Sequence, residues 1–330
     1  MKKICVCILF LLFSCYFSAL PREAKEDSEV IVFPDEKFEK AIRQLIHKPE
    51  GDIFKKDVAE ITELNLEDQG IADLRGVEHF ENLVSLYCSY NQLTYLDISF
   101  NTHLEVLCCE NNRIAALDLK GNPNLRYLYC ACNELSELDT SKNVQLRDLF
   151  CEWNSIQSLD LKNNVELMDL RCGGNPLKAL DVSNNTKMTF LYFYGTEIET
   201  LDLSCNQSLQ SLRCYNNSKL KQLYLKGATE LISITCSECN ITSLDVSGNP
   251  LLLVLQCEKN QINQLILSGA TALEEVNCSY NQLQSLDISQ LDALEYLFCH
   301  HNQIDSYSDI HGLENQPQVS VFLYCSEDDW

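Results

Sequence analysis

The sequence is dominated by a phrase that returns every 21 residues. Each copy follows the pattern L-x-x-L-x-C-x-x-N-x-L-x-x-L-D-x-x-x-N-x-x, and the first copies begin at Leu83, Leu104, Leu125, Leu146 and Leu167. Later copies begin at Met188, Leu209, Leu231, Leu252, Leu273 and Leu294, with one single-residue insertion near Ser218 and Lys219. A more divergent copy precedes them between Ile61 and Glu78. A short fixed period predicts a solenoid, in which each coil buries its apolar side against the next coil.

The two halves of each copy follow the same pattern of apolar residues before an asparagine. In the copy that begins at Leu83, apolar residues alternate before Asn91 and again before Asn101. Alternation at period two marks a strand with one buried face. We therefore expect a mainly β solenoid of about 12 coils. Each coil should carry a short strand on one side and a second strand on the other, so that two parallel sheets form with adjacent coils roughly 4.8 Å apart.

The period and its L-x-x-L-x-L-x-x-N core are typical of leucine-rich repeats. The nested 21-residue form resembles repeats of bacterial surface and secreted proteins, and the segment before it resembles the helical N-terminal cap of internalin-like proteins. In that segment Pro34 and Asp35 suit a helix start, and the residues expected on one helical face are Phe38, Ala41, Ile42 and Leu45. The resemblance covers roughly residues 30–325. It implies a protein that binds other proteins at the bacterial surface, although we find no wall-anchor motif or accessory domain after the repeats.

These patterns divide the chain into five segments. We expect a signal peptide or lipoprotein signal at 1–22, a linker at 23–32, a helical cap at 33–60, leucine-rich repeats at 61–304 and a C-terminal cap at 305–330. The first segment has basic Lys2 and Lys3 followed by an apolar stretch of signal-peptide length. Its Leu12-Phe13-Ser14-Cys15 resembles a lipoprotein signal in which Cys15 would carry the lipid, and simple secretion is the alternative. We expect an exported protein at the cell surface, in the outer envelope or secreted, with the periplasm as an alternative.

The charge balance limits the partners. The chain has 25 basic and 48 acidic residues, for a formal net charge of -23. Such a charge repels nucleic acid and anionic membranes and is compatible with basic partners. We expect a host or bacterial protein partner, no nucleic acid, no cofactor, and membrane contact only through an N-terminal lipid.

Cysteine occupies the sixth position of most copies. The ten cysteines of this column are Cys88, Cys109, Cys130, Cys151, Cys172, Cys214, Cys236, Cys257, Cys278 and Cys299. This position faces inward, where cysteine behaves as a small hydrophobe. In-register neighbours keep their Cβ atoms near the strand spacing, which is longer than the roughly 3.8 Å that a disulfide prefers. We predict free, buried thiols and no metal site, because the repeat already explains the C-x-x-C spacing of Cys236 and Cys239.

Polar columns mark the corners and the second strand of each coil. Two asparagine ladders, which include Asn112 and Asn122, should satisfy backbone groups that the turns leave unpaired. An outward aspartate column consists of Asp97, Asp118, Asp139, Asp160, Asp181, Asp202, Asp245 and Asp287. We expect lysines or hydroxyls two positions later to compensate these charges, and a calcium ladder is the alternative.

The outward positions of the first strand are the third, fifth and seventh of each copy, with the eighth at the rim. Aromatic and charged residues concentrate there in the first seven copies, and such residues anchor protein interfaces. The predicted protein-binding residues are Tyr87, Tyr127, Tyr129, Phe150, Trp153, Asp169, Arg171, Phe190, Tyr192, Tyr194, Arg213 and Tyr215. Stacking of aromatic rings for sheet stability is the simpler interpretation.

A smaller aromatic group follows at the far end, with Tyr280, Tyr296, Phe298, His300 and His301. Neighbouring residues of a strand face different ways, so we do not expect the two histidines to share a metal. No nucleophile, acid–base pair or phosphate loop stands outside the repeat pattern, and we predict no enzyme. The leading interpretation is an adhesin-like or internalin-like binding module. A self-associating envelope protein and a carbohydrate-binding surface protein are the alternatives.

Overall fold

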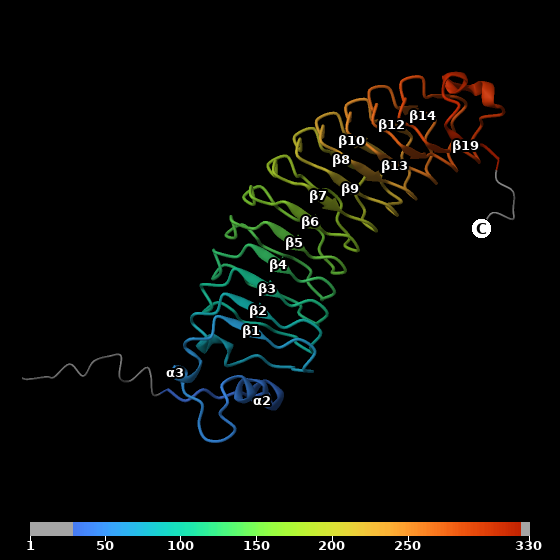
Figure 1. The fold of residues 1–330 in the computed structure, drawn as a ribbon. Helices are drawn as coiled ribbons and strands as arrows, with labels where there is room; N and C mark the ends of the chain where they lie inside the picture. Colours follow the sequence, from blue (N-terminus) through green and yellow to red (C-terminus); the bar gives the residue numbers. More distant parts are fainter. Residues whose placement is uncertain (1–28, 325–330) are drawn as a thin grey trace, which may run out of the picture.

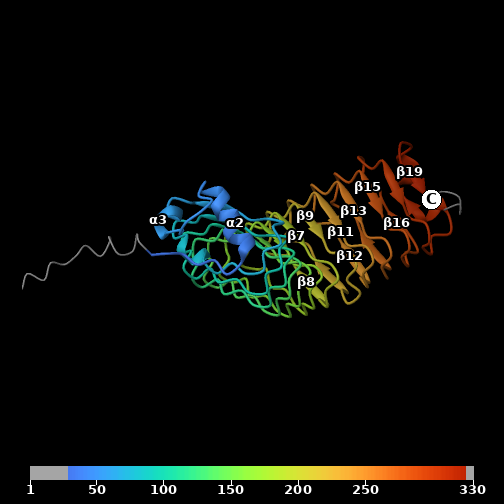
Figure 2. The ribbon, with the colours of Figure 1, turned by 90° about the horizontal axis from the view of Figure 1, so that it is seen from below.

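The computed structural model describes residues 29–324, which form a curved stack of coils with a helical cap at its first end (Figure 1). The predicted signal segment, with Cys15, lies outside the described residues. Within residues 29–324, no helix is both long enough and apolar enough to cross a membrane. Figure 2 shows the cap at one end of the stack and the last strand at the other.

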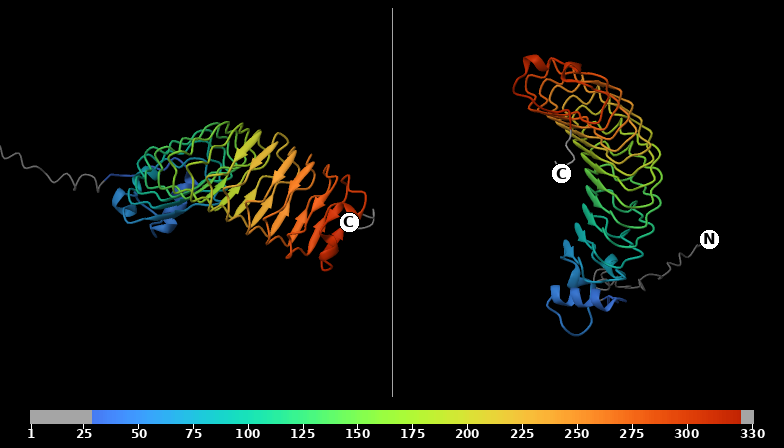
Figure 3. Two further views of the ribbon diagram at one scale, coloured as in Figure 1. Left: turned by 90° about the horizontal axis from the view of Figure 1, so that it is seen from above. Right: turned by 90° about the vertical axis from the view of Figure 1, so that its right-hand side faces the viewer.

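One strand from each coil joins a thirteen-stranded parallel sheet, in which consecutive coils are neighbours. The right-hand view of Figure 3 places its arrows along the concave inner side of the arc. Its strands are β1 (Glu63–Asn65), β2 (Ser85–Tyr87), β3 (Val106–Cys108), β4 (Tyr127–Tyr129), β5 (Asp148–Phe150), β6 (Asp169–Arg171), β7 (Phe190–Tyr192), β9 (Ser211–Arg213), β11 (Ser233–Thr235), β13 (Val254–Gln256), β15 (Glu275–Asn277), β17 (Tyr296–Phe298) and β19 (Ser320–Phe322). The predicted leucine-rich solenoid with few helices is confirmed. The one-residue insertion does not disturb the sheet, because Tyr192, Arg213 and Thr235 still pair in one register across it.

The second strand that we expected in every coil forms only in the later coils. Three separate strand pairs lie opposite the long sheet: β8 (Thr200–Asp202) with β10 (Gln222–Tyr224), β12 (Ser243–Asp245) with β14 (Gln264–Ile266), and β16 (Leu286–Asp287) with β18 (Ile310–His311). From residue 61 to 199 this side consists of turns, extended segments and one short 3-10 helix, Val77–His79. It is the outer side of the arc (Figure 1), where curvature spreads adjacent coils apart. Strand pairing needs a spacing of about 4.8 Å, so a continuous second sheet is disfavoured there.

The core is a continuous column of inward side chains from the first coil to the last. All ten sixth-position cysteines have 0% exposure, and Phe193 fills the same column in the coil that lacks a cysteine. Their predicted burial is confirmed. Burial raises the pKa of these thiols, as at Cys88, Cys151 and Cys257, because the thiolate would lose its hydration.

The asparagine ladders join each coil to the one before it. Asn112 accepts a hydrogen bond through Oδ1 from the Leu93 amide at 3.0 Å and donates through Nδ2 to the Cys88 carbonyl at 3.0 Å. In the second ladder, Asn122 donates through Nδ2 to the carbonyls of Ile98 at 2.9 Å and Asn101 at 3.0 Å. The predicted role of these side chains in satisfying the backbone is confirmed.

The second ladder also contains buried acceptors that the sequence did not indicate. Thr140 donates through Oγ1 to Asn164 Oδ1 at 2.9 Å. The Oδ1 atoms without a hydrogen-bond partner in this ladder belong to Asn101, Asn122, Asn143, Asn185, Asn206 and Asn249. Asn164 Oδ1 therefore accepts a hydrogen bond that the Oδ1 atoms of these six asparagines lack. In other copies an aliphatic residue such as Leu119 occupies the position of Thr140 and has no hydroxyl to donate.

The aspartate column is explained by local turns. Asp97 accepts from the Ser99 amide at 3.0 Å, and Asp181 accepts from the Ser183 amide at 3.0 Å. These backbone hydrogen bonds lower the pKa of both carboxyl groups. A lysine contributes where Lys162 Nζ lies 2.7 Å from Asp160 Oδ2. The compensating groups are thus the amide and the serine hydroxyl two residues later, as at Asp139 and Asp287, rather than a row of lysines.

The cap contains α2 (Glu36–Leu45) and α3 (Lys55–Val58), and short 3-10 helices occur at Val77–His79, Tyr307–Asp309 and Leu313–Asn315. Asp35 begins α2 by accepting from the amides of Lys37 at 2.9 Å and Phe38 at 3.1 Å, and its other oxygen accepts from Ala72 in the first coil at 2.7 Å. Phe38 and Ile42 are buried, as expected. Leu45 is 48% exposed, contrary to expectation, because α2 ends there above an open hollow beside Leu64.

Candidate functional site

The parallel register gathers outward residues into columns on the concave sheet. The fifth positions of five consecutive strands, β4 to β9, form the aromatic–arginine cluster: Tyr129, Phe150, Arg171, Tyr192 and Arg213. The neighbouring third-position column contains Tyr127, Asp148, Asp169 and Phe190. A constant period brings equivalent positions together, so this grouping follows from the sequence pattern.

Arg171 is held between an aromatic ring and a carboxylate. Its Cζ lies 3.9 Å from the centroid of the Phe150 ring, and its Nη2 lies 2.9 Å from Asp169 Oδ2. The Phe150 ring in turn lies 4.6 Å from the Tyr129 ring. The hydrogen bond to Asp169 raises the pKa of Arg171. The guanidinium is therefore positioned before any partner arrives, which reduces the entropy lost on binding.

Four aromatic rings form a second set of contacts at the rim of the sheet. The rings of Trp153 and Tyr194 lie 5.5 Å apart, and Tyr194 stacks on Tyr215 at 5.4 Å. The Tyr192 and Tyr215 hydroxyls are 2.9 Å apart, which joins this set to the aromatic–arginine cluster. Trp153 has a left-handed backbone with φ 53° and remains 58% exposed. The rim thus presents a large aromatic surface to solvent.

Two glycines make room for these rings, and our sequence analysis did not identify them. A Cβ on Gly173 would lie 2.4 Å from Tyr194 Cδ1, and a Cβ on Gly174 would lie 2.8 Å from Trp153 Cε3. Only in this copy are the seventh and eighth positions both glycine. This local departure from the repeat is the sequence feature that could have identified the two glycines.

Acidic side chains flank the cluster, although they were not among the predicted site residues. Burial raises the pKa of Asp148 and Glu152, and Asp148 accepts a hydrogen bond from Tyr129 Oη at 3.2 Å. Burial also raises the pKa of Glu110. These groups occupy the same outward columns as the predicted residues. They make the surroundings of the cluster acidic.

A shallow hollow of about 250 Å³ opens within the cluster. Its walls include Asp169, Arg171, Phe190, Tyr192 and Arg213, and Phe190 is 46% exposed. Tyr87 lies apart from this hollow, because Cys108 stands between it and Tyr129 in the column. The structure therefore brings most predicted residues into one continuous surface and leaves Tyr87 at its edge.

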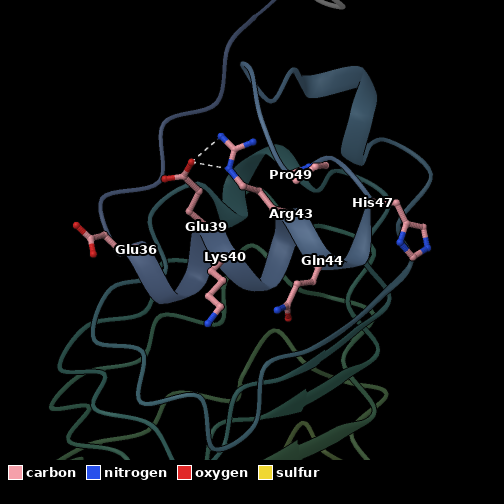
Figure 4. Close-up of a pocket in the computed structure, with 7 residues that line it drawn as sticks. All are labelled: Glu36, Glu39, Lys40, Arg43, Gln44, His47 and Pro49. Carbon is pink, nitrogen blue, oxygen red and sulfur yellow. Dashed lines mark hydrogen bonds and ion pairs between the residues drawn. The ribbon is translucent and has the colours of Figure 1, made fainter.

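A larger hollow of about 690 Å³ lies on the outer face of α2. Figure 4 shows its side chains spread along the helix rather than directed to one point. Arg43 is already engaged by Glu39, with Nε and Nη2 at 2.9 and 2.7 Å from Oε1. We assign no ligand to this hollow.

The two adjacent histidines at the far end do meet, contrary to our expectation. His300 Nδ1 and His301 Nδ1 are 2.8 Å apart, and Tyr280 stacks on the His301 ring at 4.2 Å. His301 has a left-handed backbone with φ 55°, which turns its side chain out of the strand alternation. Residues 29–324 contain no group of three or more metal-ligating side chains placed to hold an ion.

These coils, ladders and columns define a leucine-rich-repeat protein, and residues 102–143 match the family described as Leucine Rich repeats (2 copies). Within this class the chain is similar to internalins. It is 35% identical over 71 residues to Internalin J of Listeria monocytogenes, and the match covers 21% of this chain but only 8% of that protein.

Two solved structures from Listeria monocytogenes are similar over most of the chain. The functional domain of InlJ, which includes a cysteine ladder, has a TM-score of 0.64 and 29% identity, with 82% of this chain and 70% of that chain covered. The internalin InlF has a TM-score of 0.69 and 21% identity, with 90% and 97% covered.

Proposed function

We propose that this chain is a protein-binding module, exported or attached to the bacterial surface, which recognises its partner through the aromatic–arginine cluster. Internalin-like relatives suggest a protein-interaction module, and their fold is typically a non-enzymatic binding scaffold. The observation that carries the proposal is the uninterrupted run of aromatic and arginine side chains across β4 to β9, with Arg171 held over Phe150. A few residues carry most of the binding energy at protein interfaces, and tryptophan, tyrosine and arginine are enriched among them.

The surroundings of the cluster suit a polypeptide partner. The hollow lined by Phe190 and Arg213 can take one side chain, and the exposed rim around Trp153 extends the contact area beyond it. Solved structures of the same fold include Toll in complex with Spätzle and the plant receptor RGFR1 in complex with RGF2. We infer that a partner lies along the concave sheet and that basic groups on it face Asp148 and Glu152.

The proposal can be tested with the double variant Phe190→Ala and Arg213→Ala. Both side chains are exposed, so we expect an unchanged melting temperature. Capture of host extracellular proteins or bacterial surface proteins by the immobilised chain should fall about tenfold or more. The matched control is Tyr95→Ala with Tyr224→Ala, because these exposed tyrosines lie outside the long sheet. Equal capture by the site variant, or an equal loss in the control, would contradict the proposal.

The same material distinguishes the two alternatives. A self-associating envelope protein would grow in mass with concentration in light scattering, whereas a binding module would remain monomeric over the same dilution series. A carbohydrate-binding protein would retain specific glycans on a glycan array and lose them in the Phe190→Ala variant. Neither result is expected if the partner is a protein.

A further inference from the structure

A second hollow lies at the C-terminal end of the concave sheet. Its volume is about 730 Å³, within the range of roughly 300–1,000 Å³ that is usual for ligand pockets. Aromatic side chains line it from β17, from β19 and from the turn after β15, and two carboxylates complete the lining. The lining residues used below are Glu258, Glu275, Asn277, Tyr280, Phe298 and Phe322. We call this cavity the C-terminal hollow.

The two carboxylates of the C-terminal hollow are not held in ion pairs. Glu258 Oε2 is buried and accepts no hydrogen bond. Among the ion pairs of residues 29–324, none includes Glu258 or Glu275. Lys259 and His300 are the basic residues of the lining. Burial lowers the pKa of His300, and Lys259 Nζ lies 2.8 Å from Glu238 Oε1. Lys259 also interacts with Glu258, but two carboxylates face this one shared lysine, so the hollow keeps a net negative charge. Negative charge in a partly enclosed site favours binding of a cation.

The aromatic walls are arranged to receive a flat group. Phe298 and Phe322 stack with ring centroids 4.5 Å apart and an interplanar angle of 9°. Phe322 and Tyr280 are each 42% exposed, so part of the aromatic lining is open to solvent. An arginine guanidinium is planar, stacks on aromatic faces and binds carboxylates with two parallel hydrogen bonds.

The same sheet already contains such an arrangement with the arginine in place. In β6, Asp169 at the third position and Arg171 at the fifth lie beside Phe150 of the adjacent strand. In β15, Glu275 stands at the third position and Asn277 at the fifth, beside Phe298 of the adjacent strand. The carboxylate and a neighbouring ring recur, although Phe150 is on the preceding strand and Phe298 on the following one, and asparagine replaces the guanidinium.

We propose that the C-terminal hollow binds an arginine side chain of a partner polypeptide. The guanidinium lies against the Phe298 and Phe322 rings and pairs with Glu275 and Glu258, as Arg171 does with Phe150 and Asp169 within the chain. The hollow is larger than one side chain, so the residues that flank the arginine also fit. This site is separate from the aromatic–arginine cluster and does not depend on its function.

The test uses the full chain and two small probes, N-acetyl-arginine amide and N-acetyl-citrulline amide. Citrulline has nearly the same shape without the charge. At low ionic strength, calorimetry or NMR titration should show at least tenfold tighter binding of the arginine probe, and added salt should weaken it. The double variant Glu258→Gln and Glu275→Gln should lose this preference. The matched control is Glu230→Gln, because that exposed glutamate lies away from the hollow.

A further variant tests the hollow without removing a carboxylate. Asn277→Arg should place a guanidinium of the chain itself in the hollow, raise the melting temperature and abolish binding of the arginine probe. Equal binding of the arginine and citrulline probes by the folded chain would overturn the proposal. So would the absence of saturable arginine binding, or an unchanged preference in the double variant. Protein capture through Phe190 and Arg213 should be unaffected by these substitutions, so failure at one site is distinguishable from failure at the other.

Discussion

The cysteine column predicts a large difference in thiol reactivity within one folded chain. Cys205 is exposed and Cys132 is partly exposed, whereas the sixth-position cysteines are buried. The perturbation is a thiol-specific reagent added to the native chain at about pH 8, in parallel with the Cys205→Ser variant. Among the cysteines from Cys88 to Cys299, we expect one fast thiol, which the variant removes, and a slower reaction at Cys132, since attack requires an accessible thiolate.

The magnitude follows from burial. Burial raises the pKa of Cys239 from the ordinary 9.0 to about 11 and that of Cys299 to about 12. At pH 8 the thiolate fraction therefore falls about 100-fold at Cys239 and about 1,000-fold at Cys299, since each pKa unit is a factor of ten. At the sixth position the exposed fraction is also 0%, so reaction there additionally requires opening of a coil.

The assay compares native and denatured protein without reductant, with modified sites located by peptide mass spectrometry. In denaturant, every cysteine from Cys88 to Cys299 should react, because the described cysteines are free thiols. A denatured count that falls short by pairs would show disulfides and refute the prediction of a free thiol ladder. Fast labelling of Cys151 or Cys257 in the native chain would refute the burial of the column.

Three further predictions address the scaffold and the rim. Thr140→Val should lower the free energy of unfolding by about 1 kcal/mol, because Asn164 Oδ1 loses its donor; urea unfolding measures this, and Thr140→Ser should lose less. The pKa values of Asp97 and Asp181 are lowered in the folded chain, so their contribution to stability is complete above the ordinary pKa of 3.8 and is lost as the pH falls through the folded pKa values. The urea concentration at the unfolding midpoint should therefore decrease when the pH is lowered from about 5 to about 3, and it should decrease less in the Asp181→Asn variant. Gly173→Ala should displace the Tyr194 ring and weaken partner capture, with little change in melting temperature. Gly195→Ala should instead lower the melting temperature, because Gly195 has φ 58°, although its added Cβ would have no neighbour nearer than 3.9 Å.

Much of the fold could be predicted because equivalent residues of successive copies contact one another. The column from Cys88 to Cys299 and the ladder that contains Asn112 are visible in the sequence as residues one period apart. The same logic identified Phe150, Arg171 and Tyr192 as neighbours before their contacts were known. It could not identify Gly173, whose role depends on where the Tyr194 ring turns.

The rim was less predictable than the strands. Strand alternation places neighbouring side chains on opposite faces, and it misled us about His300 and His301. The eighth position adopts a left-handed backbone, as at Trp153, Tyr280 and His301, and that turn reorients the side chain. No residue-type preference in the sequence marks this conformation, because tyrosine, tryptophan and histidine occupy it as well as glycine.

The sequence by itself determined the solenoid, the register of its long sheet and the separation of buried from outward columns. These depend on periodicity alone, since a constant period places the same position of each copy beside its equivalent. Only the tertiary structure decided that the outer side forms strands in pairs, that Arg171 lies over Phe150, and that Glu258 Oε2 is buried without a hydrogen bond. These depend on the curvature of the stack and on contacts between different positions of neighbouring coils, which a repeat pattern does not encode.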